Sequence, residues 1–197
     1  MKFQDFKSFR EYDRQFVKVT NIDKRYIKSL KIEKLQEPIY GILYLDKVCG
    51  VTLRVLGDAK TEIKDKMLLL RRDCFEEIDF EVFEGTDFLN DILQNQISGY
   101  YDDKLNALLS AKELDEFRYE EFPLDVLAIL PSEKQSEQMW VRLVMKTNQE
   151  NVYIAELLDD SYFDKKYTNG KKVALVYYAK DDFKGLIING LVKIVDE

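Results

Sequence analysis

Residues 137–158 read EQMWVRLVMKTNQENVYIAELL, and this stretch decides the fold of the second half of the chain. Residues 139–146 and 152–158 are rich in apolar, aromatic and β-branched side chains, which favours strands. Residues 125–130 and 172–178 have the same character, so the region from residue 122 onward is predicted to be β-rich. Asn169-Gly170 and Asn189-Gly190 predict turns, because Asn and Gly both tolerate positive φ. The second pair predicts a terminal hairpin over residues 187–195.

The first nineteen residues carry large apolar side chains at spacings of three and four. This period predicts one amphipathic helix with an aromatic stripe. A helix that packs on its own core is the simpler interpretation, and a stripe that binds a partner is the alternative. Residues 24–34 are basic and fit either a helix or a strand. The residues of the stripe are Phe3, Phe6, Phe9, Tyr12, Phe16 and Val19.

The middle of the chain mixes both kinds of element. Residues 39–45 and 48–56 predict a hairpin that reverses at Asp46-Lys47. Residues 60–73 fit a helix at first, and their second half at 67–70 fits a helix or a buried strand equally well. Residues 78–83 alternate as a half-buried strand. Residues 86–99 and the stretch after Asp102 predict a helical pair. The fold class is therefore α+β: residues 1–121 form a mixed region with antiparallel strands and the helical pair, and residues 122–197 form a β-rich module.

Charge is spread unevenly along the 197 residues, whose net charge is −7. Residues 1–36 carry a net charge of +5, residues 37–132 carry −11, and residues 133–197 carry −1. The acidic middle disfavours nucleic-acid binding, because contacts to phosphate dominate that affinity. It fits a basic protein partner, although the basic N-terminal region is expected to pair with it inside the molecule.

Several classes of protein are excluded or disfavoured by what the sequence lacks. Histidine is absent, which rules out Ser-His and Cys-His catalytic pairs and zinc sites that contain His. No phosphate-binding glycine motif occurs. No apolar run is long enough for a membrane span, no signal peptide is recognisable, and Cys49 and Cys74 are too few for a disulfide framework. A cytoplasmic protein with no catalytic constellation, no metal site and no cofactor is expected.

The last third of the chain resembles the YegJ-like family of small bacterial proteins. Glu137, Met139, Trp140 and Val141 match its Glu-x-Met-Trp-Val opening. The matches further along the chain are Gly170, Val173, Asp182, Ile187 and Gly190, and the departures are Ala155, Glu156, the Asp159-Asp160-Ser161 turn and Phe183. The resemblance covers residues 122–197 and implies a compact β-rich module with a helical element. It implies no activity, but related families include toxin-immunity proteins.

Three groups of residues are candidates for binding. Trp140 lies in a predicted strand, where a core role is the simpler interpretation and an exposed anchor is the alternative. Asp159, Asp160 and Tyr162 belong to an acidic, aromatic loop that also holds Phe163 and Asp164. Asp79 and Glu81 share the outward face of the strand at 78–83 and extend an acidic stripe. For the loop and the stripe, a plain solvated surface is the alternative.

The preferred hypothesis is a non-catalytic protein-binding module, immunity-like, that uses the acidic face and the loop against a basic partner. An enzyme that uses carboxylates or a metal, with Asp159, Asp160 or Asp182 as ligands, is the first alternative. A structural or assembly protein that associates through its N-terminal aromatic helix is the second. The oligomeric state is left open by the sequence.

Overall fold

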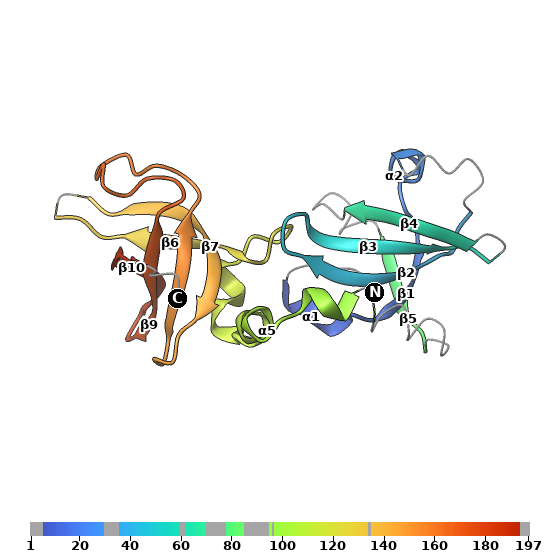
Figure 1. Cartoon of the computed structure of the whole chain (residues 1–197), viewed down its shortest axis with the longest axis horizontal. Coiled ribbons are helices and arrows are strands. Elements are labelled where there is room, and N and C mark those ends of the chain that lie inside the picture. Colours follow the sequence, from blue (N-terminus) through green and yellow to red (C-terminus); the bar gives the residue numbers. More distant parts are fainter. Residues whose placement is uncertain are drawn as a thin grey trace. The chain divides into compact units, whose positions relative to one another are not determined.

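A computed structural model shows an α+β protein that divides into two compact units (Figure 1). The structure describes residues 6–29, 36–59, 62–69, 78–84, 95, 97–133 and 135–193. Unit 1 contains residues 1–101 and 120–122, and unit 2 contains residues 102–119 and 123–197. The chain therefore passes between the units three times. Within the described part of the chain, no helix has the length and apolar character that crossing a bilayer requires.

Unit 1 is built on a five-stranded antiparallel sheet with the strand order β4-β3-β2-β1-β5. The strands are β1 (Phe16–Thr20), β2 (Ile39–Asp46), β3 (Gly50–Gly57), β4 (Glu62–Leu69) and β5 (Asp79–Val82). The helices α1 (Phe6–Tyr12) and α2 (Lys24–Ser29) precede and follow β1. Side chains from β1, β2 and β3 supply most of the described core of this unit, including Val17, Val19, Ile42, Leu43 and Leu53.

A buried polar cluster fixes Tyr101, the residue at which the chain first leaves unit 1. The Tyr101 hydroxyl donates to Asp13 Oδ1 at 2.5 Å and accepts from the Leu45 backbone N–H at 2.6 Å. The Arg14 guanidinium lies 4.4 Å from the centre of the Tyr101 ring, a cation–π distance. Burial raises the pKa of Asp13, although the Tyr101 hydrogen bond and Arg14 oppose that shift.

The structure corrects two expectations for unit 1. The predicted helix over the first nineteen residues ends at Tyr12, and Phe16 and Val19 are buried residues of β1 instead. Residues 62–69, part of a stretch expected to begin as a helix, form the strand β4. The hairpin is confirmed, with Asp46 opposite Gly50. Most of the predicted helix at 86–99 lies outside the described residues.

Unit 2 is a closed barrel with the strand order β10-β6-β7-β8-β9. Its strands are β6 (Asp125–Leu130), β7 (Glu137–Lys146), β8 (Val152–Leu157), β9 (Lys172–Lys180) and β10 (Phe183–Leu191). Successive strands pair antiparallel, and a parallel pairing of Ile187 with Ile129 closes the barrel. Inward side chains such as Val126, Val141, Ala155 and Leu175 are fully buried.

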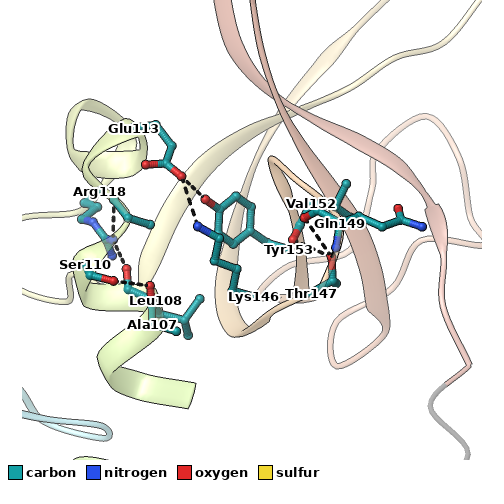
Figure 2. A network of polar contacts seen from close by, with 11 residues as sticks. Ala107, Leu108, Ser110, Glu113, Arg118, Lys146, Thr147, Gln149, Val152 and Tyr153 are labelled. Carbon is teal, nitrogen blue, oxygen red and sulfur yellow. Dashed lines mark hydrogen bonds and ion pairs between the residues drawn. The ribbon is translucent and has the colours of Figure 1, made fainter. Parts of the chain in front are cut away.

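One end of the barrel is covered by a lid formed by α5 (Asp103–Ser110) and the 3-10 helix η3 (Lys112–Phe117). The Asp102 carboxylate caps α5 by accepting from Leu105 N–H at 2.7 Å. Figure 2 shows Tyr153, a fully buried strand residue, reaching the lid and donating its hydroxyl proton to Glu113. Lys146 lies 3.8 Å from the same carboxylate. This contact ties the lid to β7 and β8.

Arg118 holds the lid together from inside. Its side chain is fully buried and donates to the carbonyl oxygens of Leu108, Ala111 and Pro123, as well as to Asp115. The carbonyls of Leu108 and Ala111 lie at the end of α5 and also accept from the backbone N–H groups of Ala111 and Leu114, so Arg118 gives each a second donor. One cation therefore links the end of the helix, where Figure 2 shows Arg118 beside Leu108, to Pro123 in the turn that leads into β6.

The end of unit 2 departs from the sequence prediction. No hairpin forms at Asn189-Gly190 in the described chain, because β10 continues to Leu191 and already pairs with β9 across a turn at Asp181 and Asp182. Gly190 has a φ of +111° and sits where the register shifts, so the pair marks a β-bulge. The other predicted turn is confirmed, with Gly170 at a φ of +80° before β9.

Candidate functional site

The loop between β8 and β9 leaves the barrel and returns to the same point. Leu157 N–H donates to the Lys171 carbonyl at 2.9 Å, and Gly170 N–H donates to the Leu157 carbonyl at 2.9 Å. Residues 158–169, which we call the aromatic loop, thus leave and rejoin the sheet side by side. Compact surface loops whose ends meet in this way are often functional.

Hydrogen bonds within the aromatic loop give it a small core of its own. Ser161 and Tyr167 are buried, and Ser161 N–H donates to the Tyr167 carbonyl at 2.8 Å. The Ser161 Oγ accepts from Asp164 N–H at 3.0 Å. Asp160 Oδ1 accepts from Asn169 N–H at 2.8 Å, which links the start of the loop to its end. The loop is therefore held in one shape by backbone as well as side-chain contacts.

Glu137, the first residue of β7, clamps the loop from outside. One carboxylate oxygen accepts from the Ser161 hydroxyl at 2.7 Å, and the other accepts from Tyr162 N–H at 2.9 Å. Burial acts to raise the pKa of Glu137, but these hydrogen bonds and one from Phe163 N–H outweigh it, so the pKa is lowered. The ionised Glu137 carboxylate thus fixes the backbone of Tyr162 and Phe163.

The clamp presents two adjacent aromatic side chains to solvent. Tyr162 is 78% exposed and Phe163 is 50% exposed, and their ring centres lie 5.1 Å apart in an edge-to-face arrangement. Large apolar side chains at this exposure lose the gain in free energy that burial would give. A rigid loop that holds them in water is suited to contact with another molecule.

Charged groups surround this aromatic pair. Asp159 and Asp160 are exposed at the start of the loop. Lys166 makes an ion pair with Asp164 at 2.9 Å, and Lys165 lies 6.0 Å from the Tyr162 ring centre. The lysines therefore interact within the loop itself, whereas the carboxylate of Asp159 makes no such interaction with any described residue.

The carboxylates proposed for an enzyme do not converge. Asp159 and Asp160 lie in the aromatic loop, Asp182 lies in the turn between β9 and β10, and all three are exposed. General acid–base chemistry needs carboxylates whose environments differ and which face a common pocket. No group of three or more acidic or cysteine side chains that could hold a metal ion is found among the described residues.

Trp140 is not a core residue. It points outward from β7 with 37% of its surface exposed, and its ring packs edge-on against Tyr119 at 5.6 Å. Its carbonyl oxygen accepts from Leu158 N–H at 3.1 Å, so the aromatic loop begins next to Trp140. The candidates Trp140, Asp159, Asp160 and Tyr162 all belong to unit 2, and the backbone hydrogen bond joins Trp140 to the residue before Asp159.

Asp79 and Glu81 belong to unit 1, whereas the aromatic loop belongs to unit 2. Glu81 makes an ion pair at 2.7 Å with Lys18, which lies opposite it in the sheet register. Asn21 donates to Asp79 at 2.5 Å. Hydrogen bonding to Lys18 lowers the pKa of Glu81. The basic N-terminal region was expected to pair with the acidic middle of the chain, and the ion pair between Lys18 and Glu81 of the acidic stripe is such a pairing.

Two residues of the site were missed as candidates by sequence reasoning. Glu137 was noticed only as part of a motif, because its partners lie 24 and 25 residues further along the chain. Phe163 carried the right signal, an aromatic residue next to Tyr162 in a polar loop.

Comparisons with family models, curated proteins and solved structures found no match to this chain. The resemblance to the YegJ-like family stays a prediction.

Proposed function

We propose that this chain is a non-catalytic protein-binding module that uses the aromatic loop to hold a basic partner. The observation that carries the proposal is the Glu137 clamp, which fixes Tyr162 and Phe163 in an exposed position. Aromatic side chains supply large contact areas at low cost in conformational entropy, and a fixed loop lowers that cost further.

The charges of the loop support a basic rather than an acidic partner. Asp159 and Asp160 are exposed in the same loop as the aromatic pair, while Lys166 is already paired with Asp164. A lysine or arginine of the partner would meet a carboxylate and an aromatic ring at once, an arrangement that combines an ion pair with a cation–π contact. An immunity-like role in the cytoplasm, in which the module neutralises a basic toxin, fits this chemistry.

The experiment is a pull-down of the tagged full chain from its native cytosol, repeated at increasing salt. Three baits are compared: the natural chain, the Tyr162→Ala/Phe163→Ala variant, and Tyr178→Ala as a matched control that removes an exposed barrel aromatic. The expected result is one basic protein that the natural chain and the control retain and that the loop variant loses.

The affinity of the purified pair then gives the size of the effect. Loss of two central aromatic side chains is expected to weaken binding by more than about tenfold. Asp159→Asn is expected to reduce the dependence of affinity on salt, because it removes one charge from the interface. A partner that binds the loop variant as tightly as the natural chain, or no partner at any salt concentration, contradicts the proposal.

A further inference from the structure

The chain contains two Asn-Gly pairs, and the structure places them in different surroundings. Asn169 and Asn189 are both exposed, and open space lies where a Cβ would stand on Gly170 or Gly190. Glycine after asparagine favours attack of the backbone nitrogen on the asparagine side chain, because glycine has no Cβ to obstruct the approach. The reactivity of each pair therefore depends on how its backbone is held.

Hydrogen bonds hold the first pair in place. Gly170 N–H, the group that would have to attack, donates to the Leu157 carbonyl at 2.9 Å. Asn169 N–H donates to Asp160 Oδ1 at 2.8 Å. Attack on the Asn169 side chain thus requires the end of the aromatic loop to open first.

The second pair lies in the β-bulge near the end of β10. The register of β9 and β10 shifts between Ile188 and Leu191 and assigns no partner residue to Asn189 or Gly190. The pairing of β10 with β6 is at Ile187, and beyond that point β10 pairs only with β9 in the described chain. The ladder is locally disrupted at a bulge, and the ends of strands open at low cost. The backbone of this pair can therefore move into the reactive geometry.

We infer that Asn189 is a site of spontaneous conversion to aspartate and isoaspartate. The Gly190 backbone nitrogen attacks Cγ of Asn189, so that a C–N bond forms and the Cγ–Nδ2 bond breaks. The side-chain nitrogen leaves as ammonia and takes the proton of the Gly190 N–H. Water then opens the resulting succinimide ring. Opening at Cγ gives aspartate and opening at the backbone carbonyl gives isoaspartate, and neither step oxidises or reduces the chain.

The isoaspartate product changes the end of the barrel. Its main chain runs through the former side chain and is longer by one carbon atom, so the residues that follow cannot keep their places beside β9. Leu191 lies opposite Val173, and Val192 N–H donates to the Lys172 carbonyl at 2.8 Å. These contacts should loosen in the isoaspartate product. The aspartate product keeps the length of the main chain at an exposed position and should preserve them.

Peptide mapping by mass spectrometry measures the conversion in the full chain alone, so no partner of the aromatic loop is required. Samples are kept at mildly alkaline pH, either folded or in urea, and conversion at the two asparagines is followed over time. In urea the two sites should convert at similar rates. Folding should slow conversion of Asn169 by more than about tenfold and that of Asn189 by much less, because Asn169 lies in a hydrogen-bonded loop that must open.

Asn189→Gln is the control for the assignment, because the longer side chain cyclises far more slowly, and it should show no isoaspartate at this position. Hydrogen exchange of the Val192 amide should be faster in the separated isoaspartate form than in the unmodified chain. Protection of Asn189 by folding that equals or exceeds the protection of Asn169 overturns the inference. So does an isoaspartate form in which the Val192 amide exchanges at the unmodified rate.

Discussion

The carbonyl oxygen of Glu121 occupies the space that a Cβ on Gly50 would take. The same oxygen accepts from Val51 N–H at 3.0 Å, so residues 120–122 are held against the start of β3. Gly50 also has a φ of +81°, a backbone conformation that disfavours any side chain. Glycine is thus required at residue 50 for two independent reasons.

Gly50→Ala is expected to destabilise the protein by about 2–5 kcal/mol, from the positive φ and the clash with a backbone atom together. Gly170→Ala is the matched control, because Gly170 has a φ of +80° but open space around the missing Cβ. The control is expected to cost about 1–2 kcal/mol, the penalty of the backbone conformation alone. Urea unfolding measures both, and equal losses would contradict the role given to Glu121.

Replacing Arg118 tests the lid of the barrel. Arg118→Met removes the buried donor of the Pro123 carbonyl and the second donor of the Leu108 and Ala111 carbonyls, so a loss of about 2 kcal/mol or more is expected in urea unfolding. Lys184→Met is the control: Lys184 pairs with Glu116 of the same lid, but both side chains are about half exposed. Such surface pairs contribute little, so the unfolding midpoint of the control should not move. Similar shifts in both variants would contradict the assignment.

Asp13 gives a prediction for pH. Its pKa is raised in the folded state, mainly by burial, so the folded protein binds this proton more tightly than the unfolded chain does. The resulting stabilisation is present below the unfolded pKa of about 3.9 and is lost as pH rises through the folded pKa. Asp13→Asn keeps an oxygen acceptor for Tyr101 and never ionises.

The free energy of unfolding of Asp13→Asn should therefore rise relative to that of the natural chain between about pH 4 and pH 7. Urea unfolding at several pH values in this range gives the difference directly. A difference that stays constant across the range would show that Asp13 does not titrate as described.

The lid also decides which fragment folds. Residues 102–197 include α5 and η3, whose buried Leu105, Leu108 and Leu114 complete the core of unit 2. This fragment is expected to unfold cooperatively and to show near-ultraviolet circular dichroism. Residues 123–197 lack the lid and should show neither property. Two fragments of equal stability would mean that the lid is dispensable.

Sequence reasoning succeeded where one local pattern determined an element. Residues 125–130 were predicted as a strand and form β6, and Asp102 begins a helix as its capping chemistry indicates. It failed where distant pairing overrides the pattern. Phe16 and Val19 continue a helical spacing. They form part of a strand instead, because β1 pairs with β2 on one side and with β5 on the other. Asn189-Gly190 was predicted to form a turn but forms a β-bulge. A positive φ is found in both structures, so the residue types alone could not distinguish them.

The candidate site shows the same division. Tyr162, Asp159 and Asp160 could be singled out because aromatic and acidic residues gather in one polar segment. Glu137 could not, because nothing near it in the chain indicates that its carboxylate receives Ser161 and Tyr162. Trp140 has apolar neighbours on both sides in sequence, which favours burial, yet Met139 and Val141 face the core and Trp140 faces away.

The parallel pairing of β10 with β6 has a consequence for synthesis on the ribosome. β6 emerges early in unit 2, but its partner β10 is the last barrel strand to be translated. Until then one side of β6 offers unpaired backbone groups to any other strand, the situation that promotes misassociation between nascent chains. Slow translation through residues 131–183 would lengthen this exposure, so codon choice in that stretch should affect the yield of folded protein.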